Sequence, residues 1–82
     1  MDKKIFTLRE GETYIKLGQA LKAVGAVSSG VEAKMVIAEG FVYVNGEVDT
    51  RRGKKLKDGD EVHIDGIEAG LYEDTDFVVK SP

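Results

Sequence analysis

The fold is decided by residues 29–46, which read SGVEAKMVIAEGFVYVNG. Ser29 and Glu32 match a capping box, a pattern typical of the start of a helix. Gly40 stops the helical pattern, because glycine readily takes the left-handed conformation that ends helices. The stretch therefore predicts a helix from about residue 30 to residue 39. Three apolar residues at helical spacing form its core-facing side: Ala33, Val36 and Ile37.

After Gly40 the apolar period changes to two, which predicts a strand over residues 41–44. Asn45-Gly46 is a strong hairpin signal. A two-residue turn would pair Val44 with Glu47, whereas a three-residue loop would pair Val44 with Val48. We favour the three-residue loop, because it places three valines on one face. Two aromatic residues would then point outward: Phe41 and Tyr43.

The N-terminal side of this stretch predicts a strand over residues 4–8, a turn at 9–12 and a short extended piece at 14–16. A first helix should follow, ended by Gly25. Its apolar face repeats at helical spacing: Leu17, Ala20, Leu21 and Val24.

On the C-terminal side, Asp58-Gly59 predicts a turn and residues 61–65 a half-buried strand. Val62 and Ile64 should point inward and His63 toward solvent. Residues 66–82 form an acidic C-terminal extension in which 77–79 can add a last strand beside the first. The fold class is α+β, with two short packed helices followed by a small, mainly antiparallel sheet with a hairpin.

Composition limits the possible functions. The chain has 82 residues, enough for one small domain, and 41% of them are hydrophobic. It has no cysteine and one histidine, which argues against disulfides and against thiolate or histidine-rich metal sites. We expect no catalytic residues, no metal, no cofactor, no small-molecule substrate and no membrane association. Without an apolar signal segment, a cytoplasmic monomer is the default expectation.

The charge is unevenly distributed. The net charge is −3, yet residues 1–57 hold eleven Lys or Arg against seven Asp or Glu, a net +4. Residues 58–82 hold one Lys against eight Asp or Glu, a net −7. Five cations lie within the seven residues 51–57, so a strong local positive field is expected there despite the negative total.

From about Lys16 to Val62, some 47 residues, the order of motifs resembles the RNA-binding domain named after small-subunit ribosomal protein S4. The likeness rests on Lys16-Leu17, on Ser29 with Ala33-Lys34, on the Gly40–Gly46 hairpin and on Gly59-Asp60. Within this family, the sequence is most similar to the short, stand-alone bacterial type represented by YaaA and YbcJ. Two positions depart from the pattern, since the wider family usually has a basic residue at Gly30 and often one at Met35.

The resemblance implies a non-catalytic protein that binds structured RNA, plausibly ribosomal RNA or an assembling ribosomal subunit. We expect the centre of the site to be the basic segment of Arg51, Arg52, Lys54 and Lys55, whose cations would meet phosphates. Further candidate contacts are Lys16, Lys22, Ser29, Lys34 and Tyr43, the last by stacking on an unpaired base. Two alternatives stay open: a protein-interaction adaptor in which exposed Val31 and Met35 supply apolar contact, and an accessory RNA-binding subunit of a separate RNA-modifying enzyme.

Overall fold

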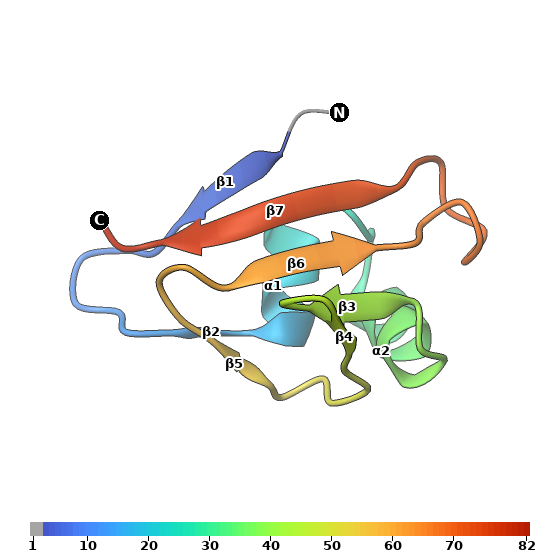
Figure 1. Cartoon of the computed structure of the whole chain (residues 1–82). Coiled ribbons are helices and arrows are strands. Elements are labelled where there is room, and N and C mark those ends of the chain that lie inside the picture. Colours follow the sequence, from blue (N-terminus) through green and yellow to red (C-terminus); the bar gives the residue numbers. More distant parts are fainter. Residues whose placement is uncertain (1–2) are drawn as a thin grey trace.

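The computed structural model describes residues 3–82, which form two short helices and seven strands (Figure 1). Neither helix in this described part of the chain has the length and apolar character needed to cross a membrane. In chain order the elements are β1 (Lys4–Thr7), β2 (Ile15–Lys16), α1 (Leu17–Ala23), α2 (Gly30–Ala38), β3 (Val42–Val44), β4 (Glu47–Val48), β5 (Lys55–Leu56), β6 (Glu61–Ile64) and β7 (Thr75–Lys80).

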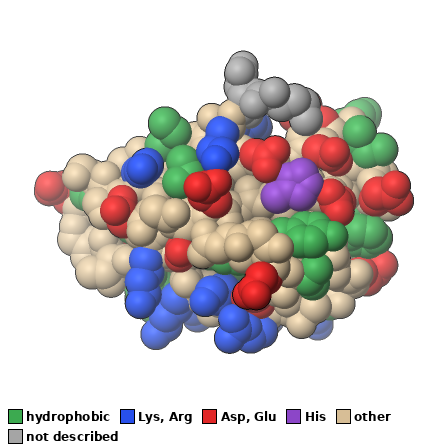
Figure 2. Space-filling model, viewed as in Figure 1, with side chains coloured by type: hydrophobic (Ala, Val, Ile, Leu, Met, Phe, Trp, Pro, Cys, Tyr) green, Lys and Arg blue, Asp and Glu red, His purple; other side chains and the backbone are tan. Residues whose placement is uncertain are grey.

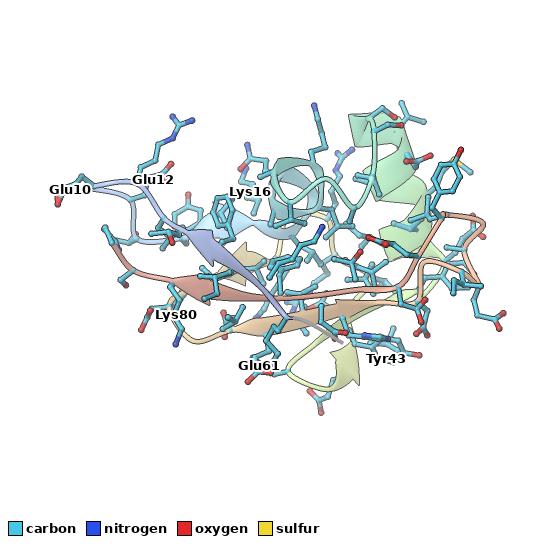
Figure 3. The ribbon with its side chains drawn as sticks, turned by 90° about the horizontal axis from the view of Figure 1, so that it is seen from above. Glu10, Glu12, Lys16, Tyr43, Glu61 and Lys80 are labelled. Carbon is cyan, nitrogen blue, oxygen red and sulfur yellow. The ribbon has the colours of Figure 1, made fainter. Side chains whose placement is uncertain are left out.

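Five strands make one sheet in the order β1-β7-β6-β3-β4, and β2 pairs with β5 in a separate antiparallel ribbon. The β1–β7 pair is parallel and the other pairs of the main sheet are antiparallel. Both helices lie on one side of the main sheet, and the other side is open (Figures 1 and 3). The predicted α+β class is confirmed.

The core lies between the helices and the covered face of the sheet. Its largest fully buried side chains come from both layers and include Phe77, Leu17, Leu21, Ile37 and Ile64. The residues predicted to face inward on the two helices and on β6 are buried, apart from Val24, which is partly buried. The alternation in β6 is as predicted, with Val62 and Ile64 buried.

The helix boundaries follow the sequence signals closely. Gly25 has a φ of +78° directly after Val24, the C-cap of α1. At α2 the Ser29 hydroxyl accepts a hydrogen bond from the Glu32 amide at 3.1 Å, as an N-cap should. The Glu32 carboxylate reaches one residue further back than in a regular capping box and accepts from the Ser28 amide at 2.9 Å. The last two residues of the loop before α2 are thereby bonded to the first turn of the helix.

The expected three-residue hairpin loop was wrong. Val44 pairs with Glu47, and Tyr43 with Val48, so the turn contains only Asn45 and Gly46. Both turn residues have positive φ, +52° and +86°, as in a type I′ turn, whose twist matches that of the strands. Val48 therefore faces the open side of the sheet, where it is 51% exposed.

The acidic C-terminal segment is a central part of the sheet. Strand β7 lies between β1 and β6, as the blue and red strands of Figure 1 show. Phe77 and Val79 are completely buried, and the expected placement of the last strand beside the first is confirmed. Removal of this segment would expose the core. The acidic residues therefore belong to a segment that the fold requires.

Candidate nucleic-acid interface

A groove of about 420 Å³ lies between α1, the first turn of α2 and the loop that joins β4 to β5. Three of its side chains are cationic, Lys16, Lys22 and Arg52, and among the described residues 3–82 no acidic one lines it. The groove is kept open by three glycines, Gly18, Gly30 and Gly53, and by the small side chain of Ala33. Gln19 also lines it. We call this the basic groove.

Backbone hydrogen bonds fix the β4–β5 loop against the start of α1. The Leu17 amide donates to the Lys54 carbonyl at 2.8 Å, and the Gly18 amide donates to the Arg52 carbonyl at 3.0 Å. These two amides belong to the first turn of α1 and have no partner within the helix. The loop thus satisfies the helix terminus, and in return the helix holds Arg52 at the groove.

The ribbon of β2 and β5 extends the positive charge. Lys16 and Lys55 are directly opposite each other in this antiparallel pair, an arrangement that is unfavourable for two like charges. The Lys55 ammonium also lies 4.9 Å from the centre of the Tyr14 ring, within the range of a cation–π contact. An anion between Lys16 and Lys55 would relieve their repulsion.

The four cations predicted as the centre of the site differ in their hydrogen-bond partners and in the depressions that they line. The Arg51 guanidinium donates two hydrogen bonds to the Asp49 carboxylate, at 3.1 and 2.8 Å. The hydrogen bonds from Arg51 lower the pKa of Asp49, and the same pair raises the pKa of Arg51. Arg51 and Lys54 line a separate depression beside the hairpin. Only Arg52 of the four lines the basic groove.

The remaining predicted residues lie at different places. Lys34 is exposed on α2 but does not line the basic groove, and the Ser29 hydroxyl is occupied by its capping bond. Tyr43 lies on the open side of the sheet, whereas Lys16 lies on the helix side (Figure 3). Tyr43 is therefore not on the side that carries Lys16, and its stacking on RNA stays a prediction. An aromatic ring that does contact one of the cations is that of Tyr14, beside Lys55.

Sequence reasoning missed Tyr14 because the pairing that places it is not local. Strands β2 and β5 have only two residues each and are far apart in the chain. A usable signal was present, since Tyr14 and Lys16 alternate in an extended piece and so share a face.

The part of the open face around His63 is acidic. His63 is hydrogen-bonded through its two ring nitrogens to Asp76 and Asp65, at 2.8 and 2.7 Å. The Asp65 carboxylate raises the pKa of the Tyr43 phenol, whose ring centre lies 5.8 Å from that of His63. Figure 2 shows acidic side chains around the histidine, and Lys and Arg gathered along the lower edge near β5. In residues 3–82 no three His, Asp or Glu side chains are placed to hold a metal ion.

A family model described as S4 domain matches residues 6–70. The chain is 50% identical over 53 residues to the Probable ribosome maturation protein RlbA of Bacillus subtilis, a match that covers 65% of this chain and 75% of the relative. It is 42% identical over 53 residues to the Putative RNA-binding protein YbcJ of Escherichia coli, covering 65% and 76%. The chain belongs to the S4 domain family.

Proposed function

We propose that this protein is a non-catalytic RNA-binding module that holds structured RNA, either ribosomal RNA or that of an assembling ribosomal subunit, in the basic groove. The observation that carries the proposal is the convergence of Lys16, Lys22 and Arg52 on one groove without a carboxylate. The names of two relatives, which refer to ribosome maturation and to RNA binding, support the same function.

The mode of binding follows from the residue types. Phosphates attract the cations, and the planar guanidinium of Arg52 can donate two parallel hydrogen bonds to one phosphate. Tyr14 is 38% exposed beside Lys55 and can stack on an unpaired base at the end of the groove. Recognition would depend on shape and charge, with little readout of base edges, as is usual for folded RNA.

The test is a binding titration of a fluorescent ribosomal RNA hairpin at several salt concentrations. With three to four neutralised phosphates, the log–log salt slope should be about −2.7 to −3.6. The charge-reversed variant Lys16→Glu/Arg52→Glu should lose binding while its circular dichroism stays that of the wild type.

A matched control carries the same change in total charge at another place. Lys4→Glu/Lys80→Glu alters two strand residues outside the basic groove. This variant should keep most of the affinity. Equal losses in both variants would show that only the net charge matters, and a salt-independent affinity would refute the proposal outright.

A further inference from the structure

A second groove, of about 400 Å³, lies on the opposite flank of α2, between this helix and the β6–β7 loop of residues 65–74. We call it the apolar groove. Val31 and Met35 form its helix wall and Ala69 and Leu71 its loop wall, with Val36 and Phe41 between them. Val31 is 70% exposed and Met35 is 54% exposed, although they lie one turn apart on the same side of the helix.

Exposed apolar side chains concentrate around this groove. Of the seven large hydrophobic residues that are exposed in the described part of the chain, four lie on α2 or on the β6–β7 loop. Besides the two on the helix, these are Ile67 and Tyr72. In the groove itself, exposed Val31 and Met35 line the same hollow as Ala69 and Leu71. Exposed apolar surface of this kind is typical of an interaction site.

The walls of the apolar groove are preformed. Within the loop, the Ala69 amide donates to the Asp65 carbonyl at 3.0 Å, and the Leu71 amide donates to the Gly66 carbonyl at 2.7 Å. The Ile67 amide is bound by the Asp74 carboxylate at 3.1 Å. A partner would therefore meet a structured surface and would lose little free energy in ordering the loop.

The charge of the residues that line the apolar groove indicates the charge of the partner that it would bind. Glu32 and Glu39 are the only charged residues of the apolar groove, and the Glu32 carboxylate is held in place by Ser28. The neighbouring depression shares Glu32 and Leu71 and adds Glu73, again without Lys or Arg. Phosphates would be repelled from this surface, whereas a Lys- or Arg-bearing ligand would be attracted.

From these observations we infer that the apolar groove docks a protein segment with apolar anchor side chains flanked by Lys or Arg. Gly30 and Ala33 line the basic groove, while Val31 and Met35 line the apolar groove. Helix α2 therefore separates the two, and both can be filled at once. The protein would then connect an RNA to a basic protein.

The experiment uses a synthetic peptide of about 12 residues, with two leucines at positions i and i+4 flanked by lysines, the spacing that a groove-binding helix presents. It is titrated into the isotope-labelled full chain and followed by amide chemical shifts. Shift changes should be confined to α2 and the β6–β7 loop. Peptides with Lys replaced by Glu, or with Leu replaced by Ser, should each bind at least about tenfold more weakly.

Substitutions in the protein test whether the peptide binds in the apolar groove. Val31→Ser/Met35→Ser should weaken peptide binding at least about tenfold and leave RNA binding unchanged. Ile5→Ser/Val48→Ser removes two apolar side chains of similar exposure from the open face of the sheet and should change neither peptide nor RNA binding. Glu39→Lys, which leaves the apolar residues intact, should weaken peptide binding several-fold.

Three results would overturn the inference. The first is peptide-induced shifts outside the apolar groove, or peptide affinity that none of these variants alters. The second is a concentration-dependent dimer in sedimentation that Val31→Ser/Met35→Ser abolishes, since a second copy would then be the occupant. The third is an RNA hairpin that displaces the peptide and whose own affinity falls in Val31→Ser/Met35→Ser, since RNA would then occupy the apolar groove. Loss of RNA binding by the basic-groove variants bears only on the proposed function.

Discussion

The side chain of Arg52 lies across Gly18. A Cβ atom placed on Gly18 would be 2.6 Å from Cγ and 3.3 Å from Cδ of Arg52, closer than side chains tolerate. The same pair is joined by the hydrogen bond between the Gly18 amide and the Arg52 carbonyl. The absence of a side chain in the first turn of α1 therefore determines where the guanidinium reaches the basic groove.

Gly18→Ala should reduce RNA affinity several-fold without unfolding the domain. The new methyl group displaces the aliphatic part of Arg52, which can move because it is a side chain, but the guanidinium leaves its place in the groove. Stability should change little, since the gain in helix propensity, up to about 1 kcal/mol, offsets the loss of packing. The measurements are RNA titration and thermal unfolding.

A double-mutant cycle separates this mechanism from a general disturbance of the helix. In the Arg52→Ala background, Gly18→Ala should have almost no further effect on RNA affinity, because the side chain that it displaces is gone. Additive losses would show that Gly18 acts through something other than Arg52.

Much of the fold could be predicted because its signals are local. The cap at Ser29 and the stop at Gly40 depend on neighbouring residues only, and both helix ends are found where they were expected. The register of the hairpin failed for a different reason. The predicted register placed three valines on one face, which assumed that Val48 is buried. In the structure the two-residue edge strand leaves Val48 exposed. The turn conformation of Asn45 and Gly46 determines the register instead.

The basic segment could be found by composition, but the roles within it could not. Asp49 neutralises Arg51 in an ion pair only two residues away, and the density of cations does not reveal which one is paired. The grouping of Arg52 with Lys16 and Lys22 depends on how the β4–β5 loop docks on α1. Such tertiary contacts produce no periodic pattern in the sequence.

Gly30→Lys should raise RNA affinity several-fold and steepen the salt slope by about 1. Gly30 lines the basic groove, and a Cβ atom there meets nothing within 4 Å. A cation at the N-terminus of a helix costs about 0.3–1 kcal/mol, which the gain from replacing glycine offsets. Gly30→Ala is the control, because it changes the helix in the same way and adds no charge. Equal affinities for the Lys and Ala variants would place the RNA away from α2.

Gly66→Ala should lower the free energy of unfolding by about 1–3 kcal/mol. A Cβ atom on Gly66 would be 1.9 Å from the carbonyl oxygen of Glu73, and this contact is with backbone that cannot rotate away. For a domain of this size the melting temperature should fall by about 4–8 °C for each kcal/mol. Gly53→Ala, where a Cβ atom meets nothing within 4 Å, should melt like the wild type. A stable Gly66→Ala variant would show that the two ends of the β6–β7 loop can separate freely.

Protonated His63 should stabilise the open face of the sheet. Burial lowers the pKa of His63, but the hydrogen bonds to Asp76 and Asp65, together with their negative charges, outweigh burial and raise the pKa above 6.5. The groups that face the ring are these two carboxylates, from β7 and from the end of β6, and the phenol of Tyr43 on β3. A pKa raised in the folded state means that folding favours proton uptake.

The sign of the pH dependence follows from this linkage. The contribution of His63 to stability is fully present below the unfolded pKa of about 6.5 and is lost as the pH rises through the folded pKa. Between about pH 5.5 and about pH 8.5, where other side chains titrate little, the melting temperature of the wild type should therefore decline. His63→Gln should remove this decline and give a nearly flat profile. A wild-type melting temperature that rises over the same interval would show that His63 is held neutral in the folded protein, which a direct titration of its ring protons would verify.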